Sequence, residues 1–226
     1  MKKESHLILQ EISNRNIDSL IHFTPTINLL GMYECGAIIP RGRLTKLPEY
    51  NIEMEDYVEF SDNFRYDGKD FINTSIQHPN SPLFFRFIED KKEKAWIKWC
   101  IIKISPKYIC NNDTLFSVTN AANSYNRKQI GIDGSYEKFK QMFASELIIQ
   151  SSCYTKRLNR INLPMNYTTD EQAEVLVKDD ILVKDFISVV FQNEVDMALT
   201  KAAIPNHSCS NFIVDSSLFP RNYRCE

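Results

Sequence analysis

Residues 169–177 read Thr-Asp-Glu-Gln-Ala-Glu-Val-Leu-Val, and the second half of this stretch is typical of a buried β-strand. One carboxylate, Glu174, interrupts its apolar residues. Burying a carboxylate costs free energy unless the group is paired or takes part in chemistry, so Glu174 is the first catalytic candidate. The alternative is a carboxylate on an edge strand that points to water. Glu171 is the competing acid, but it precedes the apolar run and we expect it to be exposed.

A second polar segment lies nearer the amino terminus, where a strand is predicted to run into a helix. His22 and Thr24 occupy alternate positions of the strand predicted for residues 20–24, so both side chains face one side. Asn28 follows near the start of the helix, where backbone N–H groups favour an anion or a polar ligand edge. These three residues can offer hydrogen bonds to one ligand. The alternative is that Thr24, Thr26 and Asn28 only cap the helix.

The composition favours a globular domain and excludes several classes of protein. With 226 residues, of which 43% are hydrophobic, the chain can bury a core, and we expect one domain over residues 1–226. A net charge of −2 argues against a general electrostatic grip on duplex nucleic acid, although local patches can still bind it. The six cysteines form no Cys-x-x-Cys pair, and no signal-peptide core or membrane-spanning stretch is seen. We therefore expect a cytoplasmic protein with reduced thiols, no metal site and no membrane contact.

Strands and helices alternate irregularly along the chain, which favours an α+β fold over a wound parallel sheet. Pro79 and Pro82 predict a turn. Residues 41–70 predict a long loop, with or without a short helix, that covers a site as a lid. Strands are predicted for residues 20–24, 37–39, 71–76, 95–104, 174–177, 187–191 and 211–214, and helices for 27–35, for 135–143 and for a segment that begins at Asn193.

Other polar positions are weaker candidates when taken alone. Arg65 sits near the end of the long loop, where most arginines are solvated surface charges. Residues 73–86 combine hydroxyls, an amide and aromatic rings around two prolines, as in a rigid turn that lines a pocket or in an ordinary strand-turn-strand. No glycine-rich phosphate loop, His-Glu-x-x-His, Gly-x-Ser-x-Gly or kinase motif occurs, which excludes the commonest hydrolase, metalloprotease and kinase classes.

Five motifs, taken in order, resemble the DarT family, the DNA ADP-ribosyltransferase toxins of bacterial toxin–antitoxin pairs. The resemblance spans residues 20 to about 190, and its last motif is the most specific. The motifs are His-Phe-Thr at 22–24 with Asn28, Arg-Tyr-Asp at 65–67, Thr-Ser-Ile at 74–76 with Pro79 and Asn80, Thr-Asn-Ala-Ala at 119–122, and Gln-Ala-Glu-Val-Leu-Val at 172–177.

The resemblance implies the ADP-ribosyltransferase fold, in which a split pair of small β-sheets clasps NAD in a central cleft with helices outside. It implies that Glu174 is the catalytic acid and Arg65 the catalytic arginine, with Arg43 as the fallback for that role. No metal is implied, and NAD is the co-substrate under the 41–70 lid. The residues implied to bind NAD are His22, Thr24, Asn28, Arg43, Ser75 and Asn80.

The implied acceptor is a base of single-stranded DNA, and the implied partner is a macrodomain antitoxin that reverses the modification. Binding a single strand needs stacking surfaces and local cations. The residues predicted for this role are Thr119, Asn120, Lys156, Arg157 and Arg160, with the rings of Phe84, Phe85 and Tyr154 as further candidates. The alternatives are an ADP-ribosyltransferase that modifies RNA or protein, an inactive NAD-binding or nucleic-acid-binding module, and an α+β interaction domain.

Overall fold

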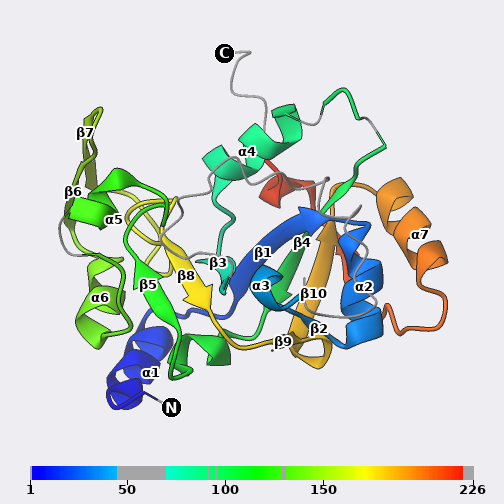
Figure 1. Ribbon diagram of the computed structural model, residues 1–226, viewed down its shortest axis with the longest axis horizontal. Helices are drawn as coiled ribbons and strands as arrows, with labels where there is room; N and C mark the ends of the chain where they lie inside the picture. Colours follow the sequence, from blue (N-terminus) through cyan, green and yellow to red (C-terminus); the bar gives the residue numbers. More distant parts are fainter. Residues whose placement is uncertain (1, 45–69, 91, 95, 129–130, 221–226) are drawn as a thin grey trace.

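The structure is a computed structural model that describes residues 2–44, 70–90, 92–94, 96–128 and 131–220. Among these residues seven strands form one sheet in the order β11-β10-β4-β1-β3-β8-β5, and two small antiparallel pairs, β2–β9 and β6–β7, lie outside it (Figure 1). The strands are β1 Leu20–Pro25, β2 Ala37–Ile38, β3 Ile72–Ile76, β4 Trp99–Ile104, β5 Leu115–Ser117, β6 Glu146–Gln150, β7 Thr155–Asn159, β8 Glu174–Val177, β9 Ile181–Leu182, β10 Phe186–Phe191 and β11 Phe212–Val214. The α-helices are α1 Ser5–Asn14, α2 Asn28–Cys35, α3 Arg41–Leu44, α4 Ser81–Asp90, α5 Ser124–Lys128, α6 Tyr136–Gln141 and α7 Glu194–Ala203.

Strand β3 divides the sheet into two halves. Its last two residues, Ser75 and Ile76, pair with Ile21 and Leu20 of β1, whereas residues 72–74 pair with β8. The pairing of β1 with β3 ends after two residue pairs, while β1 pairs with β4 along six. The mixed α+β architecture is the predicted one, and the two halves that meet at β3 correspond to the predicted split pair of sheets.

The two faces of the sheet pack against different cores, because successive strand residues point to opposite sides. Leu20 belongs to the largest cluster, which extends from Ile8 in α1 to Phe212 in β11. Ile21 belongs to a second cluster with the fully buried Phe84 of α4. In this way α4 covers the face opposite to the one on which His22 and Thr24 lie.

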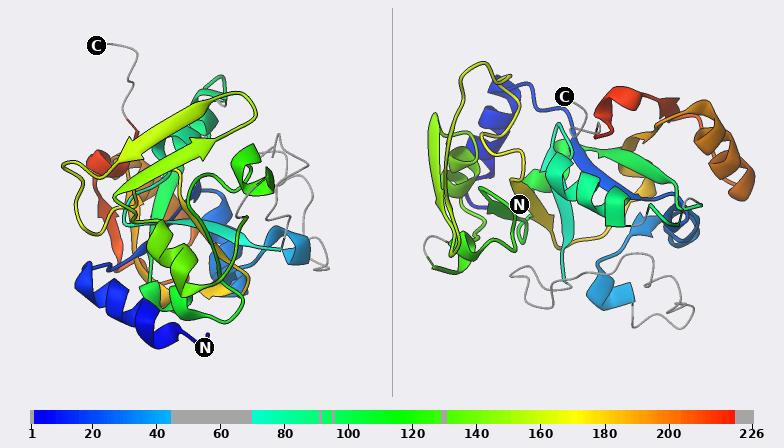
Figure 2. Two further views of the ribbon diagram at one scale, coloured as in Figure 1. Left: turned by 90° about the vertical axis from the view of Figure 1, so that its left-hand side faces the viewer. Right: turned by 90° about the horizontal axis from the view of Figure 1, so that it is seen from above.

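The remaining elements gather at the two ends of the sheet. The β6–β7 hairpin, α5, α6 and α1 lie at the β5 end, and α2 and α7 lie at the opposite end (Figure 1). Viewed from the β5 end, the hairpin is the nearest element to the reader (Figure 2, left). The segment from α5 to β8 is therefore the part of the chain that encloses this end.

Several local predictions are confirmed. Helix α2 ends at Gly36, which has a left-handed φ of 71° that glycine adopts without strain. Ser135 caps α6 by accepting a hydrogen bond from the backbone N–H of Lys138. Asn193 caps α7 in the same way through the N–H of Asp196.

Other local predictions are wrong. Residues 81–90 form helix α4 instead of continuing a turn, since Pro82 stands in the first helical turn, where its missing N–H leaves no bond unmade. Thr26 does not cap α2, whose first turn has no side-chain cap. The prediction for 95–104 was too long, because β4 begins at Trp99. Most of the predicted lid, including Arg65, lies outside the described residues.

Candidate active site

Glu174 is the first residue of β8 and is buried, with 2% of its surface exposed. Strand β8 lies between β3 and β5, so this carboxylate is not on an edge strand. Its Oε2 accepts a hydrogen bond of 2.7 Å from the backbone N–H of Ala121. Glu171 is exposed, as predicted. The choice of Glu174 as the desolvated acid of this segment is therefore confirmed, and its catalytic role stays a prediction.

The contact with Ala121 joins two of the motifs, which are 53 residues apart in sequence. Thr119 is buried and Asn120 half-buried in the turn that carries this N–H group. The Asn126 side chain holds the turn, since its Nδ2 donates to the carbonyl oxygen of Asn120 at 2.8 Å and to Ser117 Oγ at 3.1 Å. Sequence reasoning missed Ser117 and Asn126, and a backbone N–H group such as that of Ala121 leaves no signal in the sequence.

His22 lies where β1 and β3 separate. Its Nδ1 is 2.9 Å from the carbonyl oxygen of Asn73 on β3. Burial lowers the pKa of His22, and the hydrogen bond to Asn73 raises it less, so the ring is neutral at pH 7. Because a carbonyl oxygen only accepts, Nδ1 carries the proton and Nε2 is left as an acceptor.

Thr24 and Asn28 are brought together by the strand and helix that carry them. The Asn28 Nδ2 donates to Thr24 Oγ1 at 2.9 Å, and Thr24 is buried. Since neither side chain bonds the free N–H groups of α2, the capping alternative is not supported. The pair lies on the same face of β1 as His22.

Ser75 and Asn80 follow along β3 and the turn after it. Both are buried, and Ser75 stands opposite Ile21, which places it on the other face of the sheet from His22. Asn80 caps α4, because its Oδ1 accepts from the N–H of Leu83 at 3.2 Å. Its Nδ2 is buried and, like Asn73 Nδ2, has no hydrogen-bond partner among the described residues.

Arg43, the fallback for the catalytic arginine, is held away from Glu174. Its guanidinium contacts Asp180 at 2.5 Å and the carbonyl oxygen of Lys178 at 3.2 Å. Lys178 lies just beyond the far end of β8, about 13 Å from Glu174 at the usual rise of about 3.3 Å per strand residue. The structure therefore does not bring Arg43 to the carboxylate, and Arg65 lies outside the described residues.

The basic stretch predicted to bind DNA is divided by the structure. Arg157 is largely exposed and pairs with Glu146 at 3.1 Å. Lys156 points the other way, to the buried Asp170 at 3.7 Å, and Arg160 donates to backbone carbonyl oxygens, including that of Tyr167. DNA binding by this stretch stays a prediction for Arg157, whereas Lys156 and Arg160 engage the protein itself.

Three other features of the described residues concern a cavity, metal binding and the spanning of a membrane. A cavity of about 510 Å³ is lined by α6, by the residues that flank it and by Arg15, and by none of the predicted NAD-binding residues. Across the described residues no group of three His, Cys, Asp or Glu side chains could hold a metal ion. No helix in the described part of the chain is long and apolar enough to cross a membrane.

Solved structures with a similar fold carry the DarT name. Thermus sp. 2.9 DarT in complex with carba-NAD+ aligns with a TM-score of 0.56 and 12% identity, over 89% of this chain and 97% of that one. The same protein in complex with ADP-ribosylated ssDNA gives 0.51 and 10% over 90% and 97%. Thermosipho africanus DarTG in complex with ADP-ribose gives 0.55 and 15% over 89% of this chain, which spans about half (51%) of that protein. A comparison with curated proteins gave no match.

These similarities show that the chain has the fold of the solved DarT structures, in agreement with the ADP-ribosyltransferase fold that the resemblance implied. A family model described as "ssDNA thymidine ADP-ribosyltransferase, DarT" matches residues 21–218. The protein belongs to the DarT family.

Proposed function

We propose that this protein transfers ADP-ribose from NAD to a thymine base of single-stranded DNA, with Glu174 as the catalytic carboxylate. Membership of a family of ssDNA thymidine ADP-ribosyltransferases supports the reaction and the base. The observation that carries the residue assignment is the burial of Glu174 at the start of a central strand, with one oxygen fixed by the Ala121 N–H.

A fixed, buried carboxylate suits the chemistry of this transfer. Breaking the bond between nicotinamide and ribose leaves positive charge on the ribose carbon. A fixed carboxylate stabilises that charge more in the transition state than in the ground state. Because the Ala121 N–H holds Oε2 in place, Glu174 needs little reorganisation as the charge develops.

Thymine as acceptor explains a requirement for single strands. Its N1 carries the deoxyribose, so N3 is the ring nitrogen left to attack the ribose carbon, while nicotinamide leaves and N3 gives up its proton. Base pairing hides N3 in a duplex, and freeing it costs about a few kcal/mol. We propose Glu174 as the group that receives this proton, Arg65 as a cation that can orient the base or relay the proton without keeping it, and Thr119 and Asn120 as contacts to the DNA.

The residues proposed to bind NAD suit a polar dinucleotide. The free Nε2 of His22 offers an acceptor, and the buried amide groups of Asn73 and Asn80 offer donors without a partner among the described residues. A buried donor without a hydrogen-bond partner costs about 1–3 kcal/mol, and a ligand oxygen that accepts from it would recover this free energy. Thr24 and Asn28 lie on the same face as His22 and extend this set. Ser75, on the other face of the sheet, and Arg43, beyond the far end of β8, are proposed from the resemblance alone.

We further propose a macrodomain antitoxin as partner, as the resemblance to the toxins of toxin–antitoxin pairs implies. The solved Thermosipho africanus DarTG chain is about twice as long as the part that this chain matches, which leaves room for a second domain there. Such a pair would act in the cytoplasm, where NAD and DNA are both present. We infer one domain over residues 1–226, since the largest hydrophobic cluster joins Ile8 near one end of the chain to Phe212 near the other.

Labelled NAD tests this function most simply. The purified protein is incubated with NAD labelled in its adenine and with one acceptor at a time. The acceptors are a single-stranded oligonucleotide containing thymine, the same sequence as a duplex, a folded RNA and a protein extract. We expect labelling of the single strand, weak labelling of the duplex and none of the RNA or protein. Labelling of RNA or protein in place of DNA would replace the proposal by that class of acceptor.

A further inference from the structure

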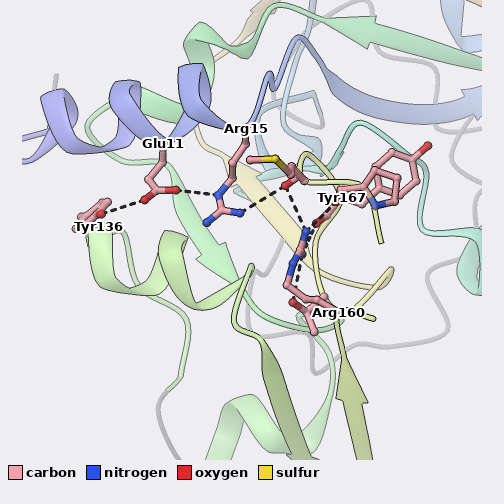
Figure 3. Close-up of polar contacts among 8 residues, drawn as sticks. Glu11, Arg15, Tyr136, Arg160 and Tyr167 are labelled. Atoms are coloured by element: carbon pink, nitrogen blue, oxygen red, sulfur yellow. Dashed lines mark hydrogen bonds and ion pairs between the residues drawn. The ribbon is translucent and has the colours of Figure 1, made fainter. Parts of the chain in front are cut away.

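Two arginines hold residues 161–169, which form most of the chain between β7 and β8 and which we call the connecting loop. Arg160 stands at its start, just past β7, and Arg15 follows helix α1 (Figure 3). The loop leads directly to Asp170 and, four residues later, to Glu174. Its position is therefore coupled to the start of the strand that carries the proposed catalytic acid.

The Arg160 guanidinium binds the loop from within. Its Nη1 donates to the carbonyl oxygen of Tyr167 at 2.6 Å and lies 3.4 Å from Thr169 Oγ1. Its Nη2 donates to the carbonyl oxygens of Pro164 at 2.8 Å and Met165 at 3.3 Å. A planar group with five N–H donors can bridge such a set of acceptors, and a lysine ammonium cannot span it.

Arg15 braces the same loop from the helix side. Its Nε donates to Glu11 at 2.8 Å, and its Nη1 reaches the carbonyl oxygen of Met165 at 3.5 Å. Both guanidinium groups lie against the ring of Phe143, Arg15 at 4.4 Å and Arg160 at 5.7 Å from its centroid. The two cations are thus placed by the Phe143 ring and by backbone carbonyl groups. Figure 3 shows the polar contacts of both arginines.

The carboxyl-terminal end of the connecting loop lies between the turn at His78 and the residues that precede Glu174. The Tyr167 ring lies 5.6 Å from that of His78, in the turn that ends at Asn80. Three residues after Tyr167, the backbone oxygen of the buried Asp170 accepts a hydrogen bond of 3.0 Å from the N–H of Ala173. Glu174 follows Ala173, so a displaced loop would move the turn before the catalytic strand.

We propose that Arg160, supported by Arg15, is a positioning residue for transfer to DNA: it sets the connecting loop between the His78 turn and Glu174. This inference rests on the proposed function, since it concerns the same reaction. It assigns Arg160 to the protein's own backbone and not to the phosphates of the DNA. The two roles predict different kinetics.

Arg157 supplies a matched control for Arg160. It lies on β7 three residues earlier, its side chain is 72% exposed, and its replacement by glutamine removes the same charge. Transfer to a thymine-containing single strand is measured for the parent, Arg160→Gln, Arg160→Lys and Arg157→Gln. We expect kcat to fall at least about tenfold in Arg160→Gln, because small displacements of a positioned group carry large rate costs. In Arg160→Gln the KM for the oligonucleotide and its salt dependence should match the parent, and Arg160→Lys should recover only part of kcat. Arg157→Gln, at the residue that stays predicted to contact DNA, should instead raise that KM and make its salt dependence shallower.

Thermal unfolding and NAD titration accompany the kinetics, so that rates are expressed per folded molecule. Arg15→Gln is the second variant, because it removes one contact and leaves those of Arg160; its kcat should fall less. Unchanged kcat per folded molecule in both Arg160→Gln and Arg15→Gln overturns the inference. A raised KM and a shallower salt dependence in Arg160→Gln, with full recovery in Arg160→Lys, overturns it in favour of a phosphate contact. The parent is assayed first, and its failure to label any single strand would reject the proposed function itself.

Discussion

Strands β7 and β8 follow each other in the chain, and both carry charged residues proposed to act in the reaction or in DNA binding. The two strands differ in how deeply they bury these residues. All four residues of β8 are buried, so Glu174 has only one environment open to it. Residues of β7 alternate between exposed and half-buried, which sends Arg157 to solvent and Lys156 inward. The burial of a charged side chain can therefore be predicted from the sequence when its neighbours in the strand are all apolar. On a half-exposed strand it can be predicted only when the pairing register of that strand is known.

The largest effect should come from the β8 side of this comparison. Glu174→Gln keeps the size of the side chain and an oxygen that can accept from Ala121, but it removes the charge that the ribose requires. We expect transfer to single-stranded DNA to fall at least about 100-fold, with an unchanged unfolding midpoint. Glu171→Gln is the matched control, because that carboxylate is exposed three residues earlier, and it should retain the parent's rate. Comparable rates in Glu174→Gln and the parent would remove Glu174 from catalysis.

The inward and outward faces of the β6–β7 hairpin can be separated by stability. Ile149 stands opposite Lys156 and is 1% exposed, whereas Ile148 stands opposite Arg157 and is 42% exposed. Ile149→Ala should lower the free energy of unfolding by about 2–4 kcal/mol, and Ile148→Ala by less than about 1 kcal/mol. Denaturant unfolding of both variants gives these values. Equal losses would mean that the hairpin does not distinguish its faces as described.

His22 provides a smaller, pH-dependent test in the other half of the sheet. Burial lowers the pKa of His22 in the folded protein. As the pH falls below about 6.5, this imidazole therefore binds a proton in the unfolded chain before it does so in the folded protein. This residue's contribution to stability is present above that pH and is lost as the pH falls toward the lowered pKa. In His22→Gln the loss of stability between about pH 7 and about pH 5.5 should be smaller than in the parent, by at most about 1.4 kcal/mol per pH unit. Parallel curves for the two proteins would show that His22 is not desolvated.

Much of the site could be predicted because its signals are local. The acid in an apolar run, the alternation of His22 and Thr24, and Gly36 at the end of a helix each follow from a few adjacent residues. Helix α4 also had such a signal, since Leu83, Phe84, Phe87 and Ile88 recur at helical spacing, but the prolines drew the prediction toward a turn.

The remainder depends on contacts between distant residues. The Ala121 N–H that holds Glu174 is a backbone group, which every residue but proline has, so no side chain marks it. Arg160 reads as one more cation in a basic stretch, and only the fold shows that it bonds carbonyl oxygens up to seven residues ahead. The sequence identifies the types of residue in the site, but it does not show in which direction a side chain points or which distant residue it contacts.

The proposed reaction is the transfer of ADP-ribose by this protein to thymine in a single DNA strand. Mass spectrometry of an oligonucleotide with one thymine among adenines, cytosines and guanines, after incubation with NAD and the protein, tests it directly. We expect a mass increase of one ADP-ribosyl group that fragmentation assigns to the thymine, and no such product when that thymine is replaced by cytosine. An ADP-ribosyl group on guanine, or an unmodified strand beside consumed NAD, would contradict it.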